Sequence, residues 1–346
     1  MQIYTLNPLL DPRWDDLIAS HPQASVFHKT GWLRALARTY GYRPVVLTSS
    51  PPRERLSDGI AFCEIKSWIT GSRLVSLPFS DHAQPLLNEK EYAQDLPEWM
   101  HTTDSSHGWK YVEFRPVSVR PEWSPAFEAS QSFWLHTLNL EPGIEQLFSN
   151  THKSSIQRRI RHAERERLDY ERGVSSELID QFYDLFVITR KRHRLLPPPH
   201  SWFSNVVSEL GPDAEIRVAR KAGIPIAAML TLRHRGTVVY KYGCSDRRYH
   251  HLAGMPFLFW KLIEESKSRG LEKIDLGRTE PENRGLIEFK DRLGTTRTMT
   301  RYLRYPQKHG TMPVSSSDRG VIGSFFAMLP KPLSSSLGCL VYRHIG

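Results

Sequence analysis

The sequence is poor in cysteine and in long apolar runs, and each absence narrows the classes of protein it can encode. Its cysteines are Cys63, Cys244 and Cys339. Three isolated cysteines provide neither a disulfide framework nor a set of zinc ligands, and they fit a reducing setting. No run approaches the roughly 20 apolar residues that cross a bilayer, and the first residues lack the basic and apolar regions of a secretory signal. We expect a cytoplasmic protein, soluble or peripheral at a membrane.

Motifs of several large enzyme classes are absent as well. The chain contains no HExxH, no pair of CxxC motifs and no GxxxxGK(S/T), so neither a metal hydrolase nor a P-loop enzyme is supported. Its 15 histidines are scattered without the spacing of metal ligands. We expect no metal site.

Acidic residues are in the minority, and the basic excess is partly local. Lys and Arg number 47 against 37 Asp and Glu, a formal net charge of +10. Basic side chains gather in residues 153–172 and 190–194. Such clusters suit a phosphate-bearing partner: a nucleotide-linked substrate, coenzyme A, tRNA or an anionic membrane surface. The alternative is a solvated helix face, since Glu164 and Glu166 are interleaved with the first cluster.

The pattern of apolar residues predicts two successive units of mixed helix and strand. In the first, a helix around 32–40 precedes strands at 44–47, 60–66, 73–77 and 111–115. The stretch 117–131, rich in Pro and Ser, predicts a linker or an exposed loop. The second unit starts with a strand at 133–140, followed by a basic helix and by a helix whose expected N-cap is Ser176.

Residues 215–305 are the most regular part of the second unit. Strands are expected at 215–220, 224–233 and 237–243, joined by short glycine-containing turns typical of antiparallel hairpins. The segment 236–295 predicts a strand, a helix, a second strand and a short helix, and a last strand follows at 297–305. The fold class is therefore α/β with mixed sheets. Because chemistry in such folds gathers at strand ends, residues 236–295 are the first place to look for function.

This order of elements resembles the GNAT acyltransferase superfamily, and more narrowly its Fem-like branch. Members of that branch carry two tandem GNAT-type domains and transfer aminoacyl or acyl groups to amines. The matching segments are THKSSIQRRIRHAERE, TRKRHRLLPPP, GIPIAAMLTLRHRGTVVYKYGCSD, IDLGRT and GLIEFKDRLGT. The resemblance implies a more degenerate GNAT-like domain at 1–132 and a second GNAT-like domain at 133–310. The tail at 311–346 either forms an amphipathic segment on an inner-membrane surface or packs on the second domain.

The resemblance also implies an acyl-CoA or an aminoacyl-tRNA as co-substrate, with no permanently bound cofactor. Acetyl-CoA-dependent relatives hold the pyrophosphate with an Arg/Gln-x-x-Gly-x-Gly/Ala loop that opens a helix. The matching place here predicts Arg247, Arg248 and Gly254 as donor-binding residues. A histidine, His251, replaces the first glycine of that loop. Acetyl-CoA is therefore the less secure choice, and an aminoacyl-tRNA or another activated acyl donor stays open.

Acyl transfer to an amine passes through a tetrahedral oxyanion, which needs a nearby positive charge or N–H donor and a route for the amine proton. The resemblance implies that Lys290 lies close to the reacting carbonyl; the alternative is a surface lysine on an amphipathic helix. Arg278 either clamps a phosphate or carboxylate or pairs with a neighbouring acid. Asp275 is either a proton acceptor or a partner in a strand-end salt bridge.

A second group of residues is predicted to bind the acceptor. Two of them follow a strand, two close a helix beside a proline run, and two lie on the expected central strand: Asp81, His82, Arg192, His193, Tyr240 and Tyr242. The respective structural alternatives are a turn, capping of the helix C-terminus and core packing. Because side chains alternate along a strand, the two tyrosines are predicted to share one face, with Lys241 on the other.

Three functions are consistent with these features. The first is an acyltransferase that acts on an amine acceptor in cell-envelope or exopolysaccharide biosynthesis, since the chain also resembles bacterial proteins of such gene systems. The second is a catalytically degenerate GNAT-like binding or scaffold protein in an envelope-assembly complex. The third, an RNA-binding module, is supported by the basic helices alone, which lack clustered aromatic residues nearby.

Overall fold

The computed structural model describes residues 2–87, 109–119, 127–306 and 341–344. It divides into two compact units. The first comprises residues 1–133, 299–315 and 339–346, and the second comprises residues 134–298 and 316–338. Both combine mixed sheets with helices, so the predicted α/β class is confirmed. The predicted amphipathic tail at 311–346 lies outside the described residues, except for 341–344, which are helical.

In the described part of the first unit, a sheet carries the helices α1 (Arg13–Ser20) and α2 (Thr30–Tyr40). Its strands, in spatial order, are β1 (Tyr4–Leu6), β2 (Arg43–Thr48), β3 (Ile60–Ile65), β4 (Arg73–Val75), β5 (Tyr111–Phe114) and β12 (Thr296–Pro306, in this unit from Met299). Neighbours pair antiparallel except for β4 and β5, which are parallel. Large rings such as Trp14, Trp32 and Phe62 are fully buried. Together with buried aliphatic side chains such as Leu33 and Val46, they form the apolar core of this unit.

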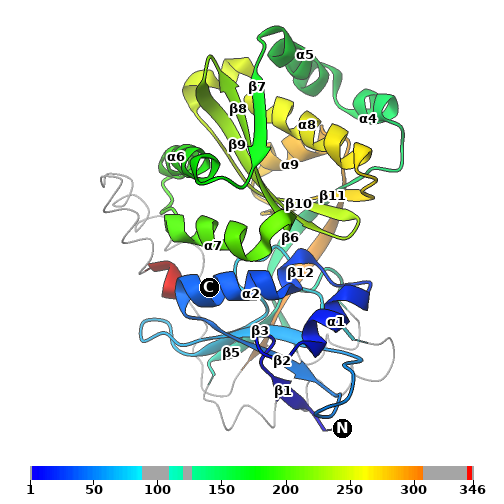
Figure 1. Cartoon of the computed structure of the whole chain (residues 1–346), viewed down its shortest axis with the longest axis vertical. Helices are drawn as coiled ribbons and strands as arrows, with labels where there is room; N and C mark the ends of the chain where they lie inside the picture. The colour runs from blue at the N-terminus through cyan, green and yellow to red at the C-terminus, as the bar shows by residue number, and fades with distance from the viewer. Residues whose placement is uncertain (1, 88–108, 120–126, 307–340, 345–346) are drawn as a thin grey trace. The chain divides into compact units, whose positions relative to one another are not determined.

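The second unit has helices on both faces of its sheet (Figure 1). Its strands, in spatial order, are β6 (Glu128–Asn139, in this unit from Trp134), β11 (Lys273–Thr279), β10 (Thr237–Ser245), β9 (Ile224–His234), β8 (Ala214–Lys221) and β7 (Asp169–Gly173). The helices α6 (Ser176–Arg192) and α7 (His200–Leu210) cover one face. The other face is covered by α8 (Gly254–Ser268), with α5 (Arg158–Arg165) packed beside it. Two shorter α-helices also lie in the described part of the unit, α4 (Ile144–Asn150) and α9 (Arg284–Asp291).

Two local predictions between residues 117 and 176 are wrong, and one helix was missed. The stretch 117–131 is not a loop throughout, because β6 already begins at Glu128. The N-cap of α6 is Ser175, whose hydroxyl accepts a hydrogen bond from the Leu178 N–H at 3.3 Å, rather than Ser176. Helix α7 was not predicted; it begins directly after Pro199, at the end of the proline run. The strands at 214–221, 224–234 and 237–245 follow the prediction closely.

The two tyrosines of β10 lie on opposite faces of the sheet, contrary to prediction. The pairing of β10 with β9 shifts between Tyr240 and Tyr242, which leaves Lys241 as the extra residue of a β-bulge. The Tyr240 ring packs against Phe259 of α8, with 4.7 Å between ring centroids. Tyr242 packs instead against Phe203 of α7, at 5.4 Å. One inserted residue reverses the alternation, so the two partly buried tyrosines pack against helices on different faces.

Candidate active site

The site begins where two central strands separate. Strands β10 and β11 pair in parallel over three residues, and the last pair joins Val239 to Asp275. Beyond it β10 continues to Ser245 and β11 to Thr279 without further pairing to each other. The main-chain groups on the facing edges of this fork must therefore bond elsewhere. A ligand with amide groups can satisfy such edges as an added strand would.

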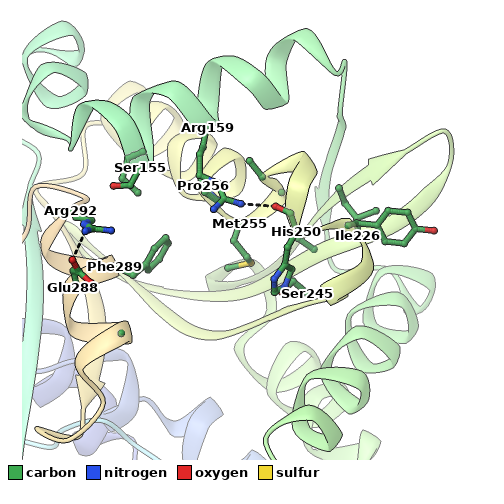
Figure 2. A pocket seen from close by; sticks show the side chains of 16 residues that line it. Ser155, Arg159, Ile226, Ser245, His250, Met255, Pro256, Glu288, Phe289 and Arg292 are labelled. Carbon is green, nitrogen blue, oxygen red and sulfur yellow. Dashed lines mark hydrogen bonds and ion pairs between the residues drawn. The ribbon is translucent and has the colours of Figure 1, made fainter.

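A cavity of about 310 Å³ opens at the end of the β10 arm. Its walls come from α5, from the 3₁₀ helix η5 (Arg247–Leu252), from the first turn of α8 and from α9. Figure 2 shows the side chains that line it. The residues used below are Arg159, Ser245, His250, Gly254, Met255 and Arg292.

This cavity favours anions. The guanidinium of Arg159 reaches over from α5 and donates to the main-chain oxygen of His250 at 2.6 Å (Figure 2). Arg292 pairs with Glu288 on α9. The first turn of α8 faces the same space, and no side chain caps it. Free N–H groups and the helix dipole attract a phosphate or a carboxylate to such a helix start.

Gly254 is required by the close approach of α8 to β9. A β-carbon at this position would lie 2.9 Å from the Cβ of Ala227, closer than real side chains come. Of the three predicted donor-binding residues, Gly254 lines the cavity, whereas Arg247 and Arg248 lie in η5 outside its lining. Arg248 is 77% exposed, and its guanidinium donates to the Asp246 carboxylate at 2.6 Å. This hydrogen bond lowers the pKa of Asp246.

Several backbone N–H groups of the turn that contains His251 already donate hydrogen bonds within that turn. Arg248 N–H donates to the Asp246 carboxylate at 2.9 Å, and Tyr249 N–H donates to the Asp246 carbonyl at 3.1 Å. Ala253 N–H donates to the main-chain carbonyl of His250 at 3.2 Å. A glycine-rich loop would leave more backbone donors for a phosphate. Here the anion would rely more on the start of α8 and on arginine side chains.

His250 and Ser245 form a hydrogen-bonded pair on the wall of the cavity. The imidazole Nε2 lies 2.9 Å from Ser245 Oγ. Burial lowers the pKa of His250, and the nearby Arg192, Arg159 and Arg247 lower it further. Arg192, a predicted acceptor residue, also donates to the carbonyl of Ser245, which lines the cavity, at 3.1 Å. Its neighbour His193 caps α6, with its N–H bonded to the Thr189 and Arg190 carbonyls.

Lys290 is buried, so the alternative of a surface lysine is wrong. Its side chain is 2% exposed. The ammonium donates to the Gly277 carbonyl at 3.1 Å, the Arg278 carbonyl at 3.3 Å and the Thr279 hydroxyl at 2.8 Å. An ammonium has three N–H groups, and each finds an acceptor here. Lys290 thus fastens α9 to the end of β11.

The end of β11 has an irregular backbone. Its pairing with β6 shifts between Asp275 and Arg278, and Gly277 has a φ of +70°. The Asp275 carboxylate accepts the Gly277 N–H at 2.7 Å and holds this turn. Arg278 follows it and is half-buried. The three predicted catalytic residues therefore meet at one strand end, on the β11 arm of the fork.

Comparisons with known proteins identify the second unit. Residues 150–291 match the family model of the acetyltransferase (GNAT) domain. This region is a GNAT acetyltransferase domain. A search of curated protein sequences found no match.

Solved structures share the fold of the whole chain. FemX is 13% identical with a TM-score of 0.68, and the match covers 88% of this chain and 97% of that one. A tandem GNAT protein from the clavulanic acid biosynthesis pathway is 12% identical, covers 90% and 99%, and has a TM-score of 0.58. L-PGS from Bacillus licheniformis is 13% identical, covers 92% and 95%, and has a TM-score of 0.55. At these identities the likeness shows the fold alone.

The predicted GNAT resemblance is thus supported by a GNAT acetyltransferase domain at 150–291, and the whole chain has the fold of FemX and of a tandem GNAT protein. This assignment implies an activated acyl donor and an amine acceptor, with no permanently bound cofactor. Among the residues that the structure describes, no three His, Cys, Asp or Glu side chains gather as metal ligands would. Within the same residues, no helix is both long and apolar enough to span a bilayer.

His136, on β6 of the second unit, is among the residues that sequence reasoning missed. Its side chain is fully buried, and Nε2 lies 3.3 Å from a carboxylate oxygen of Asp291, the residue after Lys290. Burial lowers the pKa of His136 to about 4; the charges of Lys290 and Arg297 act in the same direction, and Asp291 opposes them. A lone histidine inside an alternating strand pattern carries no signal that would distinguish it from a packed core residue.

The predicted acceptor residues of the first unit are core residues with well-defined contacts. The main-chain oxygen of Asp81 accepts the Tyr302 hydroxyl at 2.9 Å. The His82 ring stands edge-on to Phe27, with 5.4 Å between ring centroids. Both side chains are less than a tenth exposed. Their predicted role in acceptor binding stays a prediction.

Proposed function

We propose that the acyltransferase takes its acyl group from a phosphate-bearing donor whose anionic part binds in the cavity between α5, η5 and α8. The observation that carries this proposal is the joint placement of Arg159, Arg292 and the uncapped start of α8 around one opening. The fork between β10 and β11 would then guide the acyl end of the donor toward Asp275. A donor made of an anionic head and an amide-rich arm, as in an acyl-CoA, suits both features.

The reaction is a nucleophilic acyl substitution. The lone pair of the acceptor amine attacks the donor carbonyl, so that a C–N bond forms and a tetrahedral oxyanion results. The oxyanion collapses and the bond from the carbonyl carbon to the donor's sulfur or oxygen breaks. The amine proton ends on that leaving group, directly or through a side chain. Amide and free thiol or hydroxyl are the products.

We assign the β11 end of the fork to this step. Lys290 would act as a positioning residue, because its three donor groups already hold the turn at 277–279. The half-buried Arg278 would supply positive charge for the oxyanion or for the departing thiolate or alkoxide. Asp275 would keep the turn in place through Gly277 and stand near the departing proton.

The acceptor that we propose is an amine of a cell-envelope or exopolysaccharide precursor, handled in the cytoplasm. The support is the resemblance to the Fem-like branch and a fold shared with FemX and L-PGS. Arg192 lies beside the cavity wall and is the best-placed of the predicted acceptor residues. Aminoacyl-tRNA stays an alternative donor, since η5 offers few free backbone donors.

Substitution of Arg159 tests whether the cavity binds the donor. Replacing Arg159 by glutamine should weaken binding of acetyl-CoA, or of whichever longer acyl-CoA binds, by about tenfold, the worth of one charge-assisted hydrogen bond. Arg158, its exposed neighbour outside the lining, supplies the matched control R158Q, which should bind within about twofold of the wild type. Titration calorimetry measures both affinities.

A second candidate function is a GNAT-like binding protein without transferase activity. One observation favours it: backbone N–H groups of η5 donate to oxygens of the same turn and are not available to a phosphate. A thermal-shift screen separates the two. Stabilisation by an acyl-CoA or by an aminoacyl-tRNA, lost in R159Q, supports the transferase. If no donor of either class stabilises the full chain, the proposal fails and the binding protein is the better account.

A further inference from the structure

The loop between β3 and β4, residues 66–72, exposes two adjacent apolar side chains. Trp68 is 88% exposed and Ile69 is 57% exposed. Single exposed apolar residues are ordinary on protein surfaces. Two adjacent exposed apolar side chains, one of them a tryptophan, are less ordinary. Such a patch on an ordered loop is typical of surfaces that bind a membrane or another molecule. We call residues 66–72 the Trp68 loop.

Hydrogen bonds within the Trp68 loop and to the helical turn at 341–344 fix the conformation of the loop. Ser67 Oγ accepts the N–H groups of Ile69 at 3.2 Å and Thr70 at 2.9 Å. The helical turn at 341–344 braces the same place, because the carbonyl of His344 accepts Arg73 at 2.7 Å and its Nδ1 lies 2.9 Å from Ser67 Oγ. The two apolar side chains are thus presented on a fixed base. Binding through them would lose little conformational entropy.

Basic side chains surround this pair. Lys66 is 72% exposed and Arg43 is 70% exposed. Lys110 is exposed and lays its aliphatic chain against Gly71, and Arg343 is exposed on the helical turn. The acid facing Arg43 and Lys66 is the buried Glu64, at 3.0 and 3.7 Å. Glu64 balances only one of the two positive charges of Arg43 and Lys66. With Lys110 and Arg343 added, the described side chains around the Trp68 loop carry a net positive charge.

We propose that the Trp68 loop docks the first unit on an anionic lipid surface. Tryptophan prefers the boundary between headgroups and acyl chains, and an adjacent isoleucine can enter the acyl region. The exposed lysine and arginine side chains beside the loop gain from anionic headgroups. A nucleic-acid strand would call for several stacking aromatics rather than one tryptophan beside an aliphatic residue. This docking site is separate from the donor cavity, which lies in the second unit.

Vesicle co-sedimentation of the full chain tests the proposal. The wild type should bind vesicles rich in phosphatidylglycerol and leave phosphatidylcholine vesicles largely free. The double variant W68S/I69S should reduce the bound-to-free ratio about tenfold, through lost apolar insertion. The variant K66Q/K110Q should also reduce it about tenfold at low salt, through lost attraction to headgroups.

Control variants remove one exposed apolar side chain or two positive charges elsewhere. L10S acts on a leucine that is 81% exposed, and K153Q/K273Q removes two exposed lysines outside the Trp68 loop. Both should bind as the wild type does, and thermal melting confirms that every variant is folded. The proposal is overturned if the wild type ignores anionic vesicles or if W68S/I69S binds them undiminished. It is equally overturned if the Trp68 substitutions weaken binding to single-stranded RNA and leave vesicle binding unchanged.

Discussion

Replacing Lys290 by methionine should lower the free energy of unfolding by about 3 kcal/mol, which is large for one substitution. The ammonium serves two carbonyls and a hydroxyl in a buried place. Each acceptor left without a donor costs about 1–3 kcal/mol, and the apolar methionine offsets part of that sum. Urea denaturation measures the change. K153M, at an exposed lysine, should stay within about 0.5 kcal/mol of the wild type.

The same variant tests the role of Lys290 in transfer. Loss of the anchor should let the turn at 277–279 move, and kcat should fall at least about tenfold at a temperature where K290M is still folded. Transfer within about threefold of the wild type, in a folded K290M protein, would falsify a role for Lys290 in the reaction. The melting curve recorded under assay conditions separates this outcome from simple unfolding.

Acid should destabilise the protein through His136 well before its carboxylates are protonated. The folded state holds the pKa of His136 at about 4, against 6.5 for an ordinary histidine. As pH falls below 6.5 the unfolded chain takes up this proton first, so stability present above pH 6.5 is lost progressively down to about pH 4. The loss amounts to about 3 kcal/mol. Denaturation curves collected between pH 7 and pH 4 measure it.

H136F is the comparison for this pH dependence. Phenylalanine fills a similar volume and binds no proton, so the decline between pH 6.5 and pH 4 should shrink by that amount. Glu113 serves as an internal check, because its ion pairs with Arg115 and Arg304 lower its pKa despite burial. Its contribution is lost only below the ordinary glutamate range and is the same in both proteins. Equal pH slopes for wild type and H136F would contradict the buried, neutral histidine.

The sequence was sufficient for the elements whose signal is local. Strands β8, β9 and β10 were predicted from alternation and glycine-containing turns, and the GNAT assignment came from their order together with residues such as those of IDLGRT. Gly254 was predicted from its place in the loop, and the structure shows the steric reason in Ala227. These features depend on a few consecutive residues, which is what a sequence displays directly.

The remaining features depend on residues far apart in the chain. Lys290 has the surroundings of a surface lysine in its own helix, and only the turn at 277–279 makes it a buried one. In the sequence Arg159 is one basic residue among many, and only its hydrogen bond to the His250 carbonyl in η5 distinguishes it. His136 gains its low pKa from groups on α9. A local pattern contains no information about partners that distant pairing brings together.

The bulge at Lys241 makes the number of residues in β10 matter more than their kind. Deleting one residue there would restore regular alternation and turn every later side chain of the strand to the opposite face. Ser245 would leave the wall where it meets His250, although neither residue had been changed. Natural and laboratory variation at position 241 should therefore tolerate substitutions readily, and single-residue insertions or deletions between 236 and 245 hardly at all.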